Sequence, residues 1–217
     1  ELDMDRISAG MAEYEAEHGK VGLLAAMVTG QSHDADGLFY RGSAPTWSQK
    51  IVTENLPGLL EAQDEVSVID FHTGLGPFGV PYIVHGYAPG TEAFKAFRRA
   101  YGDDVKSTED PADIDENMPA TPEGPIVLAF DKILPGKSSY AVVIEYGTYP
   151  PDRVFPVLMK DNWLHAYGDL DSVVGREIKA EIKEIFYPAS DKWKDMIWDE
   201  SVKAMRCSAK LVRDKVL

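Results

Sequence analysis

A carboxylate and an imidazole stand two positions apart where an apolar run gives way to glycine. Residues 66–71 are rich in β-branched types, and Asp70 and His72 come just before the sequence TGLGPFG. Side chains two positions apart on a strand share a face. Asp70 can therefore fix the tautomer of His72, as a histidine that binds a metal requires. The pair predicts a metal or catalytic site at a strand end, and a hydrogen-bonded core histidine is the competing interpretation.

A single acid interrupts a second apolar run, YAVVIEYGTYP, at residues 140–150. Taking a carboxylate out of water costs several kcal/mol unless it is paired or its ionisation changes. Glu145 is therefore a candidate general base with a raised pKa. The alternative is that Glu145 points outward at a sheet edge. His72 and Glu145 lie 73 positions apart, so only the fold can bring them together.

The other histidines offer weaker candidates for chemistry. His33 and Asp36 form a local pair in the sequence HDAD, but a zinc site needs three or four ligands. A site rebuilt from His33, Asp36 and His72 is therefore a minor alternative. The remaining histidines are interpreted as packed or solvated side chains: His18, His85 and His165.

The composition excludes several classes of protein. With 217 residues, 44% of them apolar, the chain can bury a core, and its net charge of −14 argues against a nucleic-acid partner. No apolar run approaches the roughly 20 residues of a membrane span, so we expect no membrane partner. Cys207 is the single cysteine, so no disulfide forms within the chain, and a reducing, cytoplasmic location is expected.

The elements that must position these side chains follow from periodicity and from helix and turn signals. We expect helices over 2–17, 20–29, 46–61, 91–102, 152–167, 171–186 and 190–214, and strands over 66–71, 81–85, 126–133 and 140–146. An acidic, proline-rich loop is expected over 107–125. This order predicts an α/β fold, a three-layer α/β/α sandwich with a mixed sheet. Two helices open the chain with no strand before them, which hints that the first strands of the sheet lie upstream.

Four segments resemble successive blocks of an uncharacterised bacterial family related to the zinc carboxypeptidases and to succinylglutamate desuccinylase and aspartoacylase. They are IDFHTGLGPFG, GQSHDADGLFYRGSAPTWS, VVIEYGTYP and LMKDNWLHAYGD, and the resemblance covers nearly the whole chain. It implies a zinc-carboxypeptidase-like fold with zinc as cofactor. It also implies that His72 is the third zinc ligand, that Asp70 is its partner, and that Glu145 activates the zinc-bound water.

The chain departs from this pattern in two places. It contains no His-x-x-Glu, the motif that supplies the first two zinc ligands in the superfamily, and no Asn-Arg pair to grip a substrate carboxylate. The resemblance therefore implies that residues 1–217 are the C-terminal part of a single catalytic domain. On this interpretation an N-terminal segment or an oligomer completes the site.

Two functions are predicted from different classes. The first is a zinc-dependent hydrolase of an amide or peptide bond, acting on a small-molecule or peptide substrate. Arg41, Thr73 and Tyr146 are its candidate substrate contacts. The second is a metal-free, catalytically inactive binding or interaction domain that retains the fold.

Overall fold

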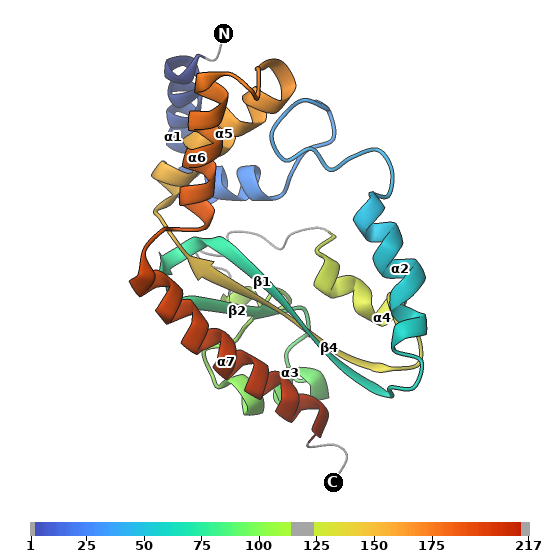
Figure 1. Ribbon diagram of the computed structural model, residues 1–217. Helices are drawn as coiled ribbons and strands as arrows, with labels where there is room; N and C mark the ends of the chain where they lie inside the picture. The colour runs from blue at the N-terminus through green and yellow to red at the C-terminus, as the bar shows by residue number, and fades with distance from the viewer. Residues whose placement is uncertain (1–2, 114–123, 214–217) are drawn as a thin grey trace.

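The computed structural model describes residues 3–113 and 124–213 (Figure 1). The helices are α1 (Met4–Val28), α2 (Trp47–Leu59), α3 (Glu92–Tyr101), α4 (Phe130–Ile133), α5 (Pro151–Tyr167), α6 (Val173–Phe186) and α7 (Asp191–Arg213). The strands are β1 (Glu65–Phe78), β2 (Pro81–His85), β3 (Lys106–Ser107) and β4 (Ser138–Gly147). No helix in this part of the chain is both long and apolar enough to cross a membrane.

The four strands form one mixed sheet, as predicted. Their order is β1-β4-β2-β3, with β4 parallel to β1 and antiparallel to β2, and β3 parallel to β2. The β4 strand is therefore internal, while β1 lies at the margin of the sheet. Because β1 and β4 are parallel neighbours, their carboxyl ends reach the same edge of the sheet.

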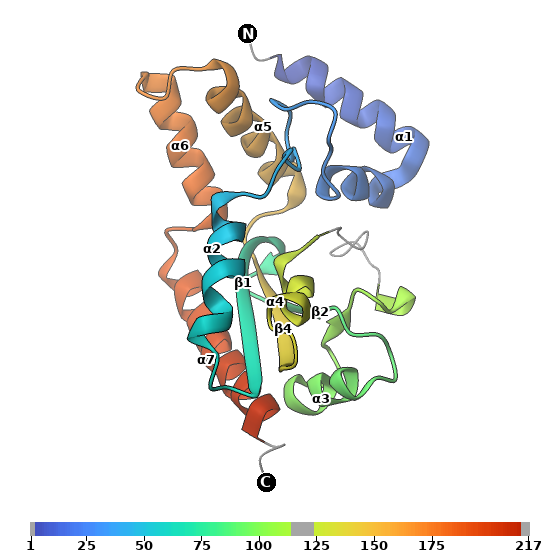
Figure 2. The ribbon, with the colours of Figure 1, turned by 90° about the vertical axis from the view of Figure 1, so that its right-hand side faces the viewer.

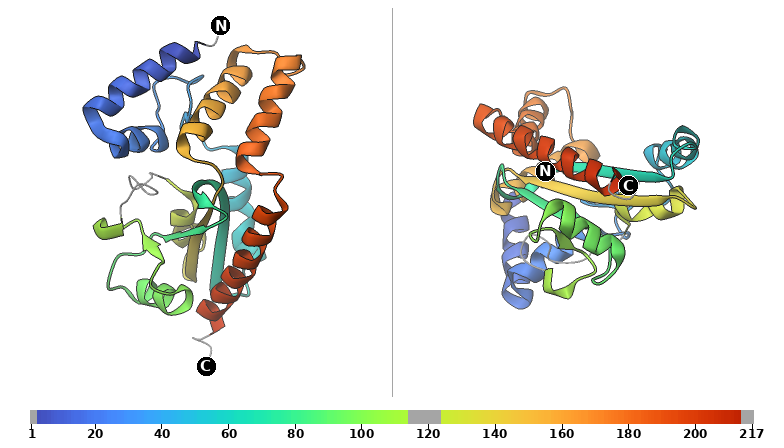
Figure 3. Two further views of the ribbon diagram at one scale, coloured as in Figure 1. Left: turned by 90° about the vertical axis from the view of Figure 1, so that its left-hand side faces the viewer. Right: turned by 90° about the horizontal axis from the view of Figure 1, so that it is seen from below.

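Helices pack against both faces of this sheet (Figure 3). Alternate residues of β4, including Val142 and Ile144, pack with Phe97 of α3 and Trp193 of α7. The intervening positions face the other way, and Ala141 packs with residues of α2 and α4. Such alternation is the period-two burial of a strand between two helical layers.

Three further helices lie beyond the end of the sheet at which β4 finishes (Figure 2). The α5 helix follows β4 directly, and Val154 and Val157 of α5 pack against Ile185 of α6. The α1 helix and the loop after it lie beside this pair. These elements therefore surround the carboxyl ends of β1 and β4.

The predicted strand over 126–133 was wrong. Residues Ile126–Ala129 form a 3₁₀-helix that continues into α4. Val127, Phe130 and Leu134 are the buried members of this segment, and their spacing of three and four residues is helical rather than alternating. The short apolar run hid that period.

The expected break between the two opening helices is confirmed, because the non-helical Gly19, with φ 72°, divides α1. Other boundaries differ from the prediction. The β1 strand continues seven residues past position 71, to Phe78, and β3 was not predicted. Residues 114–123 of the predicted acidic loop lie outside the described residues.

The imidazole of His85 is enclosed in the core, and this burial predicts a pH-dependent stability. His85 is 1% exposed, its Nδ1 accepts from the Tyr87 N–H at 3.1 Å, and its ring packs on Phe97. Burial lowers the pKa of His85 from 6.5 to about 4; Asp113 opposes the shift and Arg98 adds to it. Below pH 6.5 the His85 imidazole therefore binds a proton in the unfolded chain but stays neutral in the folded chain until the pH nears 4.

Stability is expected to be fully present above pH 6.5 and to fall as the pH drops toward 4, by about 3 kcal/mol in total. Urea unfolding of the wild type and of His85→Phe between pH 7.5 and 4 measures this contribution. The variant should lose less stability than the wild type over that range. Parallel curves for the two proteins would show that His85 is not the group responsible.

Candidate functional site

The parallel pairing of β1 and β4 brings together the acid and the imidazole that lie 73 residues apart in sequence. His72 is the cross-strand partner of Glu145 in this register. Directly paired residues point to the same face of a sheet, as do residues two apart on one strand. Asp70, His72 and Glu145 therefore project together from the face that α2 and α4 cover nearer the other end of the strands.

The three side chains form an acid–imidazole–acid arrangement. His72 Nε2 lies 2.9 Å from Asp70 Oδ2, and His72 Nδ1 lies 3.7 Å from Glu145 Oε2. His72 is half exposed, whereas Glu145 is 20% exposed. A neutral imidazole that donates its Nε2–H to Asp70 keeps a lone pair on Nδ1. That lone pair is directed toward the side of the ring on which Glu145 lies.

The environment of Glu145 favours its neutral form. Burial raises the pKa of Glu145; the hydrogen bond from the Leu75 N–H and the nearby His72 oppose this effect, and Asp70 adds to it. The Leu75 N–H donates to Glu145 Oε1 at 3.1 Å. A carboxylate with a raised pKa beside an imidazole has the properties of a general base.

Glycine at position 74 leaves room for this carboxylate. A Cβ there would lie 3.3 Å from Glu145 Oε1 and 2.9 Å from Phe186 Cε1, and Gly74 has φ 151°. A side chain at this position would press on both groups. The glycine-rich sequence after His72 therefore shapes the site, although it does not resemble a nucleotide-binding loop.

A close crossing of two backbone segments holds Glu145 in place. The last residues of β1 pass over the end of β4, where a Cβ on Gly147 would lie 2.1 Å from Pro77 O and 2.2 Å from Gly76 O. The carbonyl of Gly147 accepts from the Gly79 N–H at 2.8 Å and from the indole N–H of Trp193 at 2.9 Å. The turn that follows Glu145 is thus anchored by β1, by the loop after it and by α7.

The structure places Thr73 and Tyr146 on the opposite face of the sheet from His72 and Glu145. The Thr73 hydroxyl donates to Phe186 O at 2.6 Å. Tyr146 is 2% exposed, and its hydroxyl lies 2.8 Å from Ser201 Oγ of α7. Each immediately follows a site residue on its strand, so period-two alternation turns it away. Both stay predictions as substrate contacts, and their positions give that role no support.

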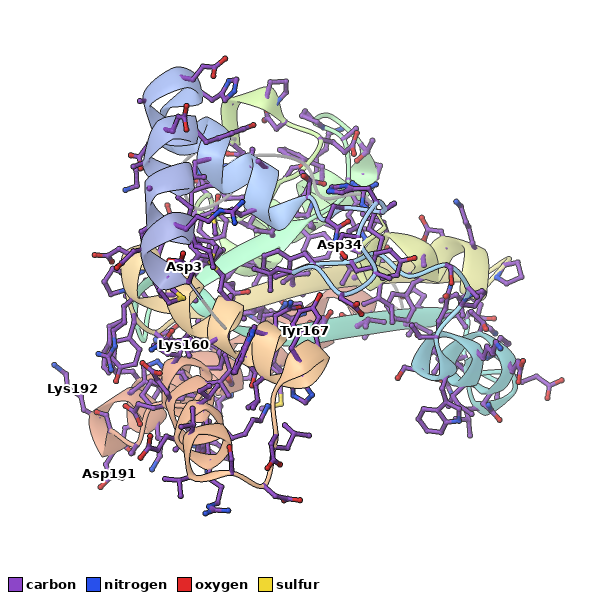
Figure 4. The ribbon with its side chains drawn as sticks, turned by 90° about the horizontal axis from the view of Figure 1, so that it is seen from above. Asp3, Asp34, Lys160, Tyr167, Asp191 and Lys192 are labelled. Atoms are coloured by element: carbon purple, nitrogen blue, oxygen red, sulfur yellow. The ribbon has the colours of Figure 1, made fainter. Side chains whose placement is uncertain are left out.

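Arg41 is engaged within its own loop. Its Nε and Nη2 lie 3.0 Å and 2.7 Å from Thr29 O at the end of α1. The same loop is tied to α5 by the Asn162 side-chain amide, which donates to Asp36 O at 2.8 Å. Figure 4 shows Asp34 of this loop near α5, on which Lys160 and Tyr167 lie. The contacts give Arg41 a structural role in the loop.

The site rebuilt from His33, Asp36 and His72 does not form. Among the described residues, no group of three or more histidine, cysteine, aspartate or glutamate side chains is placed to hold a metal ion. His33 instead lies in a turn in which its backbone N–H donates to Gln31 Oε1 at 2.9 Å. The histidine at 33 belongs to a loop of hydrogen-bonded turns.

Comparison with known proteins identifies the family. A family model described as a protein of unknown function, DUF2817, matches residues 1–200. The chain belongs to this family. No curated protein and no solved structure matched it. The family description names no activity, so the relation to zinc carboxypeptidases remains a prediction from the resemblance.

The DUF2817 site fits part of a zinc centre. His72 offers one imidazole nitrogen, oriented by Asp70, and Glu145 offers a buried carboxylate beside that nitrogen. One imidazole and a base do not complete the three protein ligands that a catalytic zinc site needs. Within residues 3–113 and 124–213 of one chain, the remaining ligands are not assembled.

Sequence reasoning missed several contributors to this site. The Leu75 N–H and Gly74 shape the carboxylate environment, and Tyr82 of β2 is the other cross-strand partner of Glu145. A glycine-rich run after a strand was visible in the sequence. Nothing in the local sequence indicated that β2 would pair with β4 in the antiparallel direction and so bring Tyr82 beside Glu145.

Proposed function

We propose that this DUF2817 protein is a zinc-dependent hydrolase of an amide or peptide bond, with His72 as one metal ligand and Glu145 as the base. The observation that carries the proposal is the convergence of a carboxylate-oriented imidazole and a partly buried carboxylate of raised pKa, 3.7 Å apart. The two lie at the carboxyl ends of parallel strands, where α/β proteins commonly bind ligands. The accompanying fold assignment is a zinc-carboxypeptidase-like sandwich, of which residues 1–217 form part.

Each side chain has a defined task. Asp70 accepts the Nε2–H of His72 and thereby keeps Nδ1 free to ligate. A bound zinc would lower the pKa of its water toward neutrality and polarise the substrate carbonyl. Glu145 accepts the proton of the attacking water and delivers it to the departing amine. The Leu75 N–H holds the Glu145 carboxylate in place for both transfers.

The raised pKa of Glu145 suits this exchange. A carboxyl of ordinary pKa is a weak acceptor for a proton from water, whereas burial raises the affinity of Glu145 for that proton.

The expected substrates are small molecules or peptides that contain an amide bond. Release of amine from a panel of N-acyl amino acids and short peptides, with zinc supplied, tests the proposal. No release above the rate of the zinc solution alone would count against it.

A second candidate is a metal-free binding or interaction domain. It is favoured by the lack of a three-ligand group among the described residues. Elemental analysis separates the two candidates, because about one zinc per chain after dialysis would contradict the metal-free domain.

Replacement of Asp70 by asparagine is expected to weaken zinc binding or turnover by about 10- to 100-fold. An amide can donate as well as accept, so it no longer enforces the Nε2–H tautomer of His72. Zinc affinity by competition with a chromophoric chelator measures the effect. Asp161→Asn is the matched control, since Asp161 of α5 pairs with Lys179 of α6. Equal losses in the two variants would argue against an orienting role for Asp70.

A further inference from the structure

Thr148 lies just past the end of β4 and makes two hydrogen bonds to one carbonyl of β1. Its side-chain hydroxyl donates to Gly74 O at 3.0 Å, and its backbone N–H donates to the same oxygen at 3.3 Å. A carbonyl oxygen has two lone pairs and can accept both bonds. Since Gly74 is paired with Gly147 in the register of the sheet, Thr148 extends the link between β1 and β4 by one residue.

The carbonyl that Thr148 contacts belongs to the peptide unit that also contacts Glu145. This unit joins Gly74 to Leu75, and its N–H donates to Glu145 Oε1 at 3.1 Å. The peptide is trans, and a trans peptide is planar, so its C=O and N–H point in opposite directions and turn together. Thr148 therefore holds one side of the unit, and the Glu145 carboxylate lies on the other.

The glycine at position 74 makes this anchoring necessary. Because glycine has no Cβ, rotation of the peptide that follows it meets little steric resistance. Phe186 packs against this position, since a Cβ there would lie 2.9 Å from Phe186 Cε1. A ring edge limits where the backbone lies but does not fix the direction of a carbonyl, as a hydroxyl donor does. The direction of the Leu75 N–H thus depends on the hydrogen bonds at the two sides of its peptide.

We propose that Thr148 is a positioning residue for the base: its hydroxyl fixes the peptide between Gly74 and Leu75, and that peptide fixes the Glu145 carboxylate. The catalytic consequence rests on the proposed function, whereas the orientation of the peptide does not. Any buried hydroxyl needs a hydrogen-bond partner, so a satisfied Thr148 alone would not assign this role. The role follows because the carbonyl that Thr148 contacts and the N–H that contacts the base form one rigid unit.

Loss of the hydroxyl would leave only the longer of the two Thr148 bonds on Gly74 O. The peptide can then rotate, and the Leu75 N–H would spend part of its time turned away from Glu145. A base that is held less firmly is placed correctly for a smaller fraction of the time, although the substrate still binds. The loss should therefore fall on kcat and leave KM close to its wild-type value.

Amide hydrogen exchange at Leu75 tests the orientation independently of hydrolysis. It is followed by NMR on the ¹⁵N-labelled 217-residue chain without metal or substrate. Thr148→Val removes the hydroxyl and keeps the shape of the side chain, so the Leu75 N–H should exchange about 10-fold faster than in the wild type. Thr148→Ser keeps a donor hydroxyl and should stay within about twofold of the wild type. Wild-type exchange in Thr148→Val, or equally fast exchange in both variants, would overturn the proposal.

Ser107→Ala is the matched control for the loss of a buried hydrogen bond. The Ser107 hydroxyl also donates to a backbone carbonyl, Tyr87 O at 2.8 Å, but it lies on β3. Exchange at Leu75 should stay near the wild-type rate in this variant, and a rate as fast as in Thr148→Val would overturn the proposal by showing a general loss of stability. If circular dichroism shows Thr148→Val to be unfolded, Thr148→Ala replaces it, because alanine also lacks the hydroxyl and adds no bulk.

Turnover of the best substrate of the amide panel, with zinc supplied, tests the catalytic consequence. Thr148→Val should lower kcat by about 10-fold, at the lower end for outer hydrogen-bonding partners of a site, with KM unchanged. Thr148→Ser should recover most of kcat. Faster exchange at Leu75 with an unchanged kcat would overturn the role of Thr148 in positioning the base. A wild type without turnover would count against the proposed function instead, and exchange at Leu75 would still decide whether Thr148 fixes the peptide.

Discussion

Replacing Glu145 with glutamine is expected to lower kcat for amide hydrolysis by about 10²- to 10⁴-fold, the usual contribution of a positioned general base. Glutamine keeps the shape of the side chain and can still accept the Leu75 N–H through its carbonyl oxygen. It cannot take a proton from water at neutral pH. The loss should therefore fall on the chemical step rather than on folding or substrate binding.

Steady-state kinetics with the best substrate of the amide panel measure this loss. Glu181→Gln is the matched control, because Glu181 is a surface acid that pairs with Lys160 and has no part in the proposed mechanism. It should turn over at the wild-type rate. Retained turnover in Glu145→Gln would remove Glu145 from the mechanism, whatever else the protein binds.

Replacing Gly147 with alanine is expected to destabilise the protein by about 3 kcal/mol or more, at or beyond the upper end of overpacking substitutions. The added methyl would lie 2.1 Å from Pro77 O and 2.2 Å from Gly76 O. These are backbone atoms, so a side-chain rotation cannot relieve the clash. The end of β1 must move, and the Leu75 N–H that holds Glu145 should move with it.

Urea unfolding of Gly147→Ala measures the stability, and turnover per folded molecule measures the disturbance of the site. Gly58→Ala is a suitable control, since a Cβ at Gly58 meets nothing within 4 Å and alanine favours a helix over glycine. It should be as stable as the wild type or slightly more so. An unfolding midpoint for Gly147→Ala equal to that of the wild type would refute the close crossing of backbone segments.

Part of the site could be predicted because local periodicity carries it. Residues 66–71 and 140–146 were recognised as strands by their β-branched runs, and alternation along β1 placed Asp70 with His72. The same rule, applied one residue further, would have turned Thr73 and Tyr146 to the opposite face. Alternation therefore gives no support to their predicted role as substrate contacts.

The partners of each strand could not be predicted from periodicity. That β1 and β4 are parallel neighbours, in a register opposing His72 to Glu145, is a pairing between distant segments. The close crossing at Gly147 depends on that pairing too. The predicted strand over 126–133 was wrong for a different reason, since a short apolar run does not distinguish a buried strand from a buried helical turn.

The central claim is that His72 binds the metal while Glu145 acts on its water, and zinc content tests it most directly. Wild-type protein, His72→Ala and Glu145→Gln are loaded with zinc, dialysed and measured for metal per folded chain. The wild type and Glu145→Gln should retain zinc, and His72→Ala should lose most of it, because that variant lacks the imidazole that offers Nδ1 to the metal. Equal zinc in His72→Ala and wild type, or none in the wild type, would contradict the account.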